Sequence, residues 1–242
     1  GEPEATWLSY QIYNDWLADF CQNNPDRFIG LGCVLNDNPS RACEEFRRVA
    51  KKGLKGIELR VNADGIPLWN PQWDQLWATA EDLDLSIALH LPGIPIPGPS
   101  ADEINVKLPN NPIGTYGNMG QVLRRAVGGG PAHGAGSLIL SGVLERHPKF
   151  TMVLGEVDIG WIPYFLSRMD TVSTERTEFP LGLPLLPSEY WKRQCLATYQ
   201  TDIVGTHNVG FIGAENIMWA SDYPHPNGVW PKSQEIIKEE LH

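Results

Sequence analysis

The chain has 242 residues, of which 42% are hydrophobic and 20% are charged, and its formal net charge is −10. The length suits one large domain, such as a single-domain barrel, or two small ones, and the composition is ordinary for a globular protein. The acidic balance argues against binding nucleic acid through its phosphates, because such binding needs clustered Lys and Arg. There is no run of about 18 apolar residues, so we expect neither a membrane span nor a membrane partner.

Four cysteines are spread through the chain without a Cys-x-x-Cys pair or a dense framework: Cys21, Cys33, Cys43 and Cys195. This usage is typical of a reducing compartment, in which thiols pack as small apolar groups. We therefore expect a cytoplasmic protein. The chain also has 9 Trp and 20 Pro, which indicates long, ordered loops.

Apolar runs and turn residues predict a repeated unit of strand and helix along the whole chain. Helices are expected within residues 1–26, at 38–52, 71–84, 136–145 and 161–172, and in a region that starts near 119 and is interrupted at 128–131. Strands are expected at residues 27–35, 56–61, 85–90, 151–156, 197–201 and 216–220. This alternation is typical of a parallel sheet buried on both faces. No linker divides the chain, so we expect residues 1–242 to form a single domain.

Two stretches are rich in proline. Residues 91–119 are far longer than an ordinary loop between a strand and a helix. Such an excursion is often a lid or a binding loop of an enzyme, and the alternative is an inert insertion. Residues 180–187 are expected to be a second loop.

Three polar side chains stand where apolar strands end: His90, Glu156 and Asp222. In a parallel array the carboxyl ends of the strands lie on one face, and this face holds the active site. An imidazole and two carboxylates can hold a divalent metal, or they can act as acid, base and orienting group without one. The structural alternatives are a core histidine for His90, a helix cap or ion pair for Glu156, and a turn-forming residue for Asp222.

Other candidates support this set. Arg60 also ends a strand and could anchor a substrate carboxylate, or it could form an ion pair inside the barrel. His225 follows Asp222 by three residues and could support it from behind. We expect His133 and His147 to face solvent or to cap a helix.

Several segments resemble the amidohydrolase-related family of metal-dependent hydrolases and decarboxylases. They are Leu-Gly-Glu-Val-Asp-Ile-Gly-Trp-Ile-Pro at 154–163, Trp-Ala-Ser-Asp-Tyr-Pro-His at 219–225, and the passages at 141–148 and 24–30. Aminocarboxymuconate-semialdehyde decarboxylase and the resorcylate-type decarboxylases are members of this family. Together the matches span about residues 20–231.

The resemblance implies an α/β fold, a (β/α)8 TIM barrel, with one divalent metal ion, Zn or Mn. It implies that His90 is a metal ligand and that Asp222 both binds the metal and handles a proton. Glu156 stands near the position where decarboxylases of the family carry a catalytic histidine, which weakens the case for decarboxylation.

The early metal ligands of the family are missing from this pattern. The family begins with His-x-His, or with an acidic residue-x-His, and this chain has no His-x-His. Glu145-x-His147 lies in the wrong place, before the fourth expected strand. Six expected strands instead of eight predict a barrel incomplete at both ends, with open sheet edges and weak metal binding.

The leading hypothesis is a metal-dependent hydrolase of a small, carboxylated organic substrate, with Asp222 and Glu156 as catalytic groups. The alternative is a metal-dependent decarboxylase of an aromatic or unsaturated acid. A third hypothesis is an inactive module that only binds a partner. Association of copies into a homo-oligomer stays open.

Overall fold

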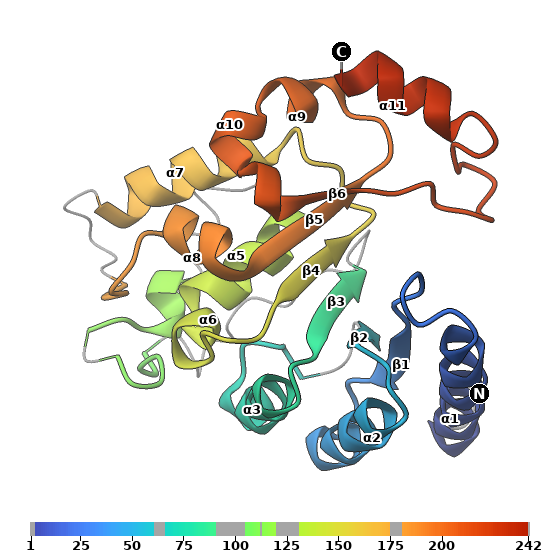
Figure 1. Cartoon of the computed structure of the whole chain (residues 1–242). Helices are drawn as coiled ribbons and strands as arrows, with labels where there is room; N and C mark the ends of the chain where they lie inside the picture. Colours follow the sequence, from blue (N-terminus) through green and yellow to red (C-terminus); the bar gives the residue numbers. More distant parts are fainter. Residues whose placement is uncertain are drawn as a thin grey trace.

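The computed structural model describes residues 3–60, 66–90, 105–111, 113–119, 131–174 and 181–241. Six parallel strands form one curved sheet in the order in which they occur in the chain (Figure 1). The strands are β1 Leu31–Leu35, β2 Gly56–Arg60, β3 Ser86–His90, β4 Met152–Gly155, β5 Cys195–Tyr199 and β6 Ile217–Trp219. All six predicted strands and the α/β class are therefore confirmed.

Helices cover the outer face of this sheet (Figure 1). They are α1 Pro3–Gln22, α2 Pro39–Lys51, α3 Asp74–Asp82, α5 Pro131–Leu140, α6 Val143–Arg146, α7 Ile162–Thr174, α8 Pro187–Gln194, α9 Ile203–His207, α10 Val209–Ile212 and α11 Ser233–Leu241, with 3-10 turns η1 Pro71–Trp73 and η2 Ala214–Asn216. The sequence did not predict α8, because its prolines read as a loop. Pro187 in fact occupies the first turn, where a missing N–H costs nothing, and the Glu189 side chain accepts from the Leu186 N–H at 2.7 Å.

The strand register separates a buried face from a face that carries the polar residues. Pairing aligns one row of apolar side chains across the sheet: Val34, Leu59, Leu89, Leu154, Ala197 and Ile217. The first five are buried under the helices. Because side chains alternate along a strand, the next row points to the other face. In this row His90 pairs with Gly155.

Large aromatic side chains fill the space between sheet and helices. Trp73, Trp77 and Trp191 have no exposed surface, and the rings of Trp77 and Phe150 stack with centroids 5.2 Å apart. Each such ring buries far more apolar area than an aliphatic residue. The unusual tryptophan content therefore belongs largely to the core.

The outer edge of β1 is covered by α1. The buried Asn14 side chain accepts the Cys33 backbone N–H at 2.7 Å and donates to the Cys33 carbonyl at 3.0 Å. It also donates to the buried Glu45 carboxylate at 2.9 Å. The amide thus takes the place of a neighbouring strand, and the edge expected to be open is closed at this position.

Two expectations from composition can be compared with this fold. Within the described residues, no helix combines the length and apolar character needed to cross a membrane. No disulfide joins the four cysteines, all of which lie in the described residues, and Cys43 and Cys195 are buried. The burial of Cys195 raises the pKa of its thiol, as expected for a packed apolar group.

Candidate active site

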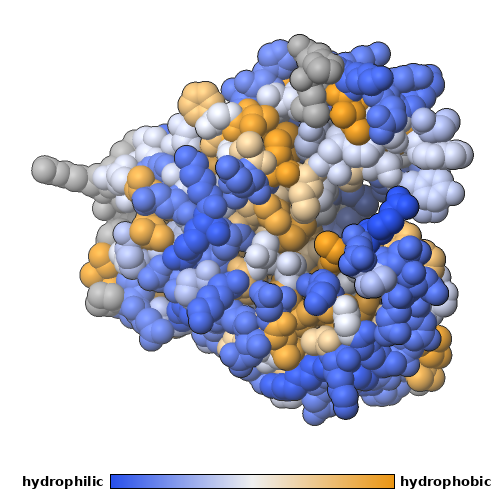
Figure 2. Space-filling model, viewed as in Figure 1, coloured by the Kyte–Doolittle hydropathy of each residue, from blue (hydrophilic) through white to orange (hydrophobic). Residues whose placement is uncertain are grey.

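The predicted strand-end residues lie at one end of the sheet. His90 is the last residue of β3, Glu156 directly follows β4, and Asp222 follows β6 by three residues. The strand arrows in Figure 1 point toward this end. In the same view, Figure 2 shows the surface hollowed between the part with β6 and α11 and the part with α1 and β1. The candidate residues therefore share the face on which parallel α/β enzymes hold their sites.

His90 and Glu156 form a contact pair on neighbouring strands. His90 Nε2 lies 2.9 Å from Glu156 Oε2, and the side chains are 37% and 42% exposed. Both groups therefore remain accessible to a ligand. The structure thus brings together two of the three expected strand-end residues, and neither is a sealed core residue.

The backbone at Glu156 is turned into the left-handed region, with φ of 54°. Its N–H donates to Thr198 Oγ1 on β5 at 2.7 Å. A left-handed conformation is uncommon for a residue with a side chain and is held by surrounding contacts. Here it turns the chain away from β4 directly after the strand ends.

Asp222 and His225 form a second pair, in the turn after β6. His225 Nδ1 lies 3.2 Å from Asp222 Oδ2, with side-chain exposures of 55% and 11%. Asp222 also has a left-handed backbone, with φ of 53°. The turn is so tight that a Cβ at Gly228 would lie 2.7 Å from the Asp222 carbonyl oxygen, which leaves no room for a larger residue there. A mostly sheltered carboxylate is thus held beside an exposed imidazole.

The protonation of His225 decides which neighbour it bonds. The Asn227 backbone N–H donates to Nδ1 at 3.2 Å when this nitrogen carries a lone pair. Asp222 Oδ2 lies at an ion-pair distance of 3.2 Å from the same nitrogen, so a protonated His225 is held by charge beside this carboxylate. The exposed ring therefore lies between solvent and the Asp222 carboxylate.

The donor atoms fit a divalent metal ion in kind, since His90 offers an imidazole nitrogen and Asp222 a carboxylate. Within the described ranges, however, no three His, Cys, Asp or Glu side chains come together in a way that could hold a metal ion. The described residues thus pair His90 with Glu156 and do not bring Asp222 into a group with them. They match the expected ligand set in the kind of donor atom but not in its arrangement.

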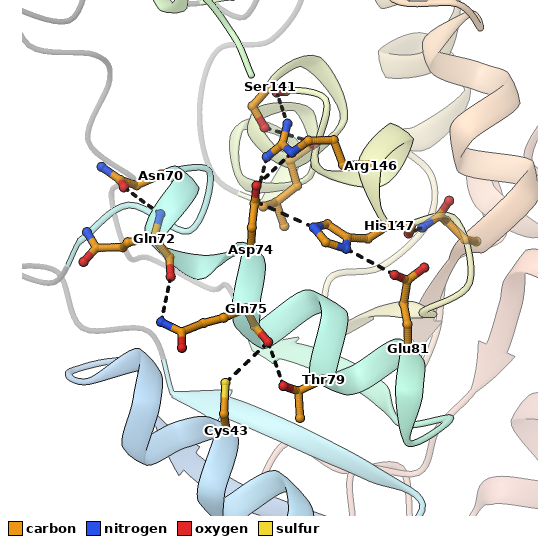
Figure 3. Close-up of polar contacts among 12 residues, drawn as sticks. Cys43, Asn70, Gln72, Asp74, Gln75, Thr79, Glu81, Ser141, Arg146 and His147 are labelled. Carbon is orange, nitrogen blue, oxygen red and sulfur yellow. Dashed lines mark hydrogen bonds and ion pairs between the residues drawn. The ribbon is translucent and has the colours of Figure 1, made fainter. Parts of the chain in front are cut away.

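The sequence also singled out Arg60, the 91–119 segment and His147. The side chain of Arg60 and most of the 91–119 segment lie outside the described residues. His147 was expected to face solvent or to cap a helix: it is buried and occupies the C-cap of α6, and Nδ1 lies 3.1 Å from Glu81 (Figure 3). The adjacent Arg146 donates twice to Asp74. This cluster joins α3 to the end of α6.

Sequence reasoning missed Asp202, which caps α9 and also reaches the loop after β4. Its negative charge adds to the effect of burial and raises the pKa of Asp158. Burial chiefly, with smaller effects of Glu240 and Asp202, also raises the pKa of Tyr199. The sequence did offer one signal, because Asp202 is another acidic residue shortly after an apolar strand. The same position is equally typical of a residue that caps a helix.

A histidine and carboxylates on the rim of a parallel α/β sheet are the layout of a barrel-type enzyme. The family model described as amidohydrolase matches residues 8–241. The chain therefore belongs to the amidohydrolase family, as its motifs indicated.

Curated relatives are decarboxylases. Gamma-resorcylate decarboxylase from Rhizobium sp. (strain MTP-10005) is 27% identical over 232 residues, which cover 88% of this chain and 65% of the relative. The 2-amino-3-carboxymuconate-6-semialdehyde decarboxylase from Dictyostelium discoideum is 25% identical and aligns with 95% of this chain and 60% of its own length. The chain thus spans less than two thirds of the length of these relatives.

Solved structures share the fold. The 5-carboxyvanillate decarboxylase from Sphingomonas paucimobilis is 26% identical, with a TM-score of 0.69, 97% of this chain covered and 67% of that chain. A manganese-bound 5-carboxyvanillate decarboxylase from Novosphingobium aromaticivorans has a TM-score of 0.66 at 23% identity, with 92% and 63% covered. The predicted TIM-barrel type of α/β fold is confirmed by these neighbours.

Proposed function

We propose that the protein is a metal-dependent carboxy-lyase that removes the carboxylate of a small aromatic acid as CO2. The observation that carries the proposal is the Asp222–His225 pair, a sheltered carboxylate beside an exposed imidazole on the rim. The decarboxylases among the relatives favour this reaction over hydrolysis, the first expectation from the sequence. Hydrolysis remains the competing reaction within the same family.

In this reaction Asp222 acts as the acid. The carboxyl group gives its proton to the ring carbon that bears the substrate carboxylate. The bond between this carbon and the carboxylate then breaks, its electron pair restores the aromatic ring, and CO2 leaves. His225 returns a proton from solvent to Asp222, and its choice between two partners suits this transfer.

His90 and Asp222 are the residues we expect to hold a divalent ion, zinc or manganese. When bound, such an ion neutralises the negative charge of a carboxylated substrate. Glu156 lies against His90 and fixes the orientation of its ring. Arg60 remains the predicted anchor for the substrate.

The test combines metal content with turnover. The purified protein is analysed for bound metal, then supplied with Mn²⁺ or Zn²⁺ and with 2,6-dihydroxybenzoate or 5-carboxyvanillate. CO2 release is followed for the wild type, His90→Ala and Asp222→Asn. The exposed His207→Ala and Asp82→Asn serve as matched controls.

We expect CO2 release and bound metal in the wild type and in both controls. His90→Ala should lose the metal, and Asp222→Asn should lose turnover. Metal binding with hydrolysis of an ester or lactone but no CO2 release would favour the hydrolase. A folded wild type that neither binds metal nor turns over either acid would contradict the proposal and favour a binding module.

A further inference from the structure

We propose that Asp202 is a positioning residue, which locks the loop after β4 so that Glu156 stays against His90. The activity part of this inference rests on the proposed function, whereas its structural part does not. Asp202 lies beyond β5, in the next unit of the chain. The hydrogen bonds of its carboxylate go to backbone N–H groups and not to the candidate catalytic side chains.

The Asp202 carboxylate joins two loops. Oδ2 accepts the backbone N–H groups of Ile159 at 2.7 Å and Gly160 at 2.5 Å. Oδ1 accepts the Gly205 N–H at 2.8 Å and so caps α9. Two successive N–H groups that converge on one oxygen form an anion-binding nest, which the chain fills with its own carboxylate. Bonds of this charged type are about twice as strong as neutral ones.

The two loops approach each other so closely that only glycine fits at the contact. A Cβ on Gly160 would lie 2.7 Å from Asp202 Oδ1. A Cβ on Gly205 would lie 2.2 Å from the Ile159 side chain. Neither position has room for a side-chain methyl group, so the close contact depends on glycine at both.

The loop needs such a clamp because its backbone is strained. Glu156 and Asp158 have φ of 54° and 55°, a left-handed conformation that residues with a side chain rarely adopt unless other contacts hold it. Thr198 holds the Glu156 N–H, and the Trp161 indole donates to the Val157 carbonyl at 2.9 Å. Asp202 adds the bonds at the far end of the loop.

The consequence falls on the Glu156 carboxylate. With its backbone fixed by Thr198 and the following turn fixed by Asp202, this side chain is directed toward His90 Nε2 at 2.9 Å. Release of the turn would let Glu156 leave the left-handed region. The imidazole would then lose the group that orients it.

Two variants disturb the contact from opposite sides. Asp202→Ser keeps an oxygen that can cap α9 but removes the second oxygen from the nest. Gly160→Ala pushes against Asp202 from the other loop. Gly210→Ala is the control, because a Cβ there meets nothing within 4 Å.

The first measurement is amide hydrogen exchange of the 156–160 segment, which does not depend on turnover. We expect faster exchange in Asp202→Ser and Gly160→Ala and no change in Gly210→Ala. Unchanged exchange in Asp202→Ser would overturn the inference, whether or not the protein is a decarboxylase.

The second measurement is the kinetics of CO2 release. We expect kcat to fall about tenfold or more in both variants, with KM changed less than about twofold, because misplacement of an orienting group acts on the chemical step. In a Glu156→Gln background, Asp202→Ser should cause no further loss, since both act through one group. Losses that multiply would show that Asp202 does not act through Glu156. If the wild type shows no turnover, the proposed function is contradicted. The amide hydrogen exchange result alone then tests the role of Asp202.

Discussion

Two of the histidine–carboxylate groups among the described residues have opposite characters. At the rim, His90 and Glu156 are 37% and 42% exposed. In the helix layer, His147 and Glu81 are 10% and 16% exposed. The distances in the two pairs are nearly equal, 2.9 Å and 3.1 Å. The difference therefore lies in their surroundings.

In the helix layer the carboxylates are fully used. Glu81 contacts His147 with one oxygen and accepts the Lys149 N–H at 2.7 Å with the other. Asp74 accepts from Arg146 with both oxygens, at 3.0 Å and 2.8 Å (Figure 3). His147 Nε2 lies 3.7 Å from Asp74, which is an ion-pair distance but too long for a hydrogen bond. Carboxylates whose oxygens are all engaged in this way fasten helices, whereas the exposed rim pair keeps capacity for a ligand.

The largest expected effect tests the rim through Asp222→Asn. Removal of the acid should lower kcat by about 10²–10⁴-fold, the usual contribution of general acid catalysis. The fold should persist, because the turn is held by backbone bonds such as Val229 N–H to the Ser221 carbonyl. CO2 release measures the loss of turnover, and circular dichroism shows whether the fold persists. Equal loss of turnover in Asp82→Asn would show that the effect is not specific to the rim.

The next effect tests the helix layer through Arg146→Ala. The side chain is 8% exposed, and its loss leaves Asp74 without its main partner. We expect the free energy of unfolding to fall by about 1–3 kcal/mol, less than for a fully buried pair because Asp74 is 31% exposed, with kcat unchanged. Arg41→Ala is the control, because Arg41 binds Glu4 in the same two-bond geometry on the surface. Urea unfolding should give it a clearly smaller loss.

The sequence predicted where the rim residues lie better than it predicted contacts between distant parts of the chain. Strand ends placed His90, Glu156 and Asp222 on one rim, because parallel strands fix where their carboxyl ends lie. The burial of His147 was not predicted, because its partner Glu81 is 66 residues away in the chain and Pro148 suggested an exposed turn. Asp202 was missed for the same reason: its bonds to Ile159 and Gly160 cross between two loops, and local patterns do not record such contacts.

A smaller effect concerns the pH dependence of the helix-layer cluster. Burial raises the pKa of Asp74, but the nearby His147 ring and the Arg146 guanidinium, which donates two hydrogen bonds, outweigh it and leave the pKa below the ordinary 3.8. A lowered carboxyl pKa stabilises the fold above the ordinary value, and this contribution is lost as the pH falls through the folded value. We expect the stability difference between wild type and Asp74→Asn to be constant near neutral pH and to shrink below about pH 4. Urea midpoints across this range measure it, and a difference that grows toward acid would contradict the assignment.

The smallest effect on stability should come from Glu156→Gln. An exposed histidine–carboxylate pair contributes about 0–1 kcal/mol, so the free energy of unfolding should change by less than about 1 kcal/mol. Turnover should nevertheless fall about tenfold or more, because a neutral amide oxygen is a weaker acceptor than a carboxylate and orients the His90 ring less firmly. Glu81→Gln, the same change in the buried pair, should do the reverse: a larger loss of stability and unchanged kcat. If both variants lost stability equally and neither lost turnover, the exposed pair would be another structural contact, and the site would have to be sought around Asp222 alone.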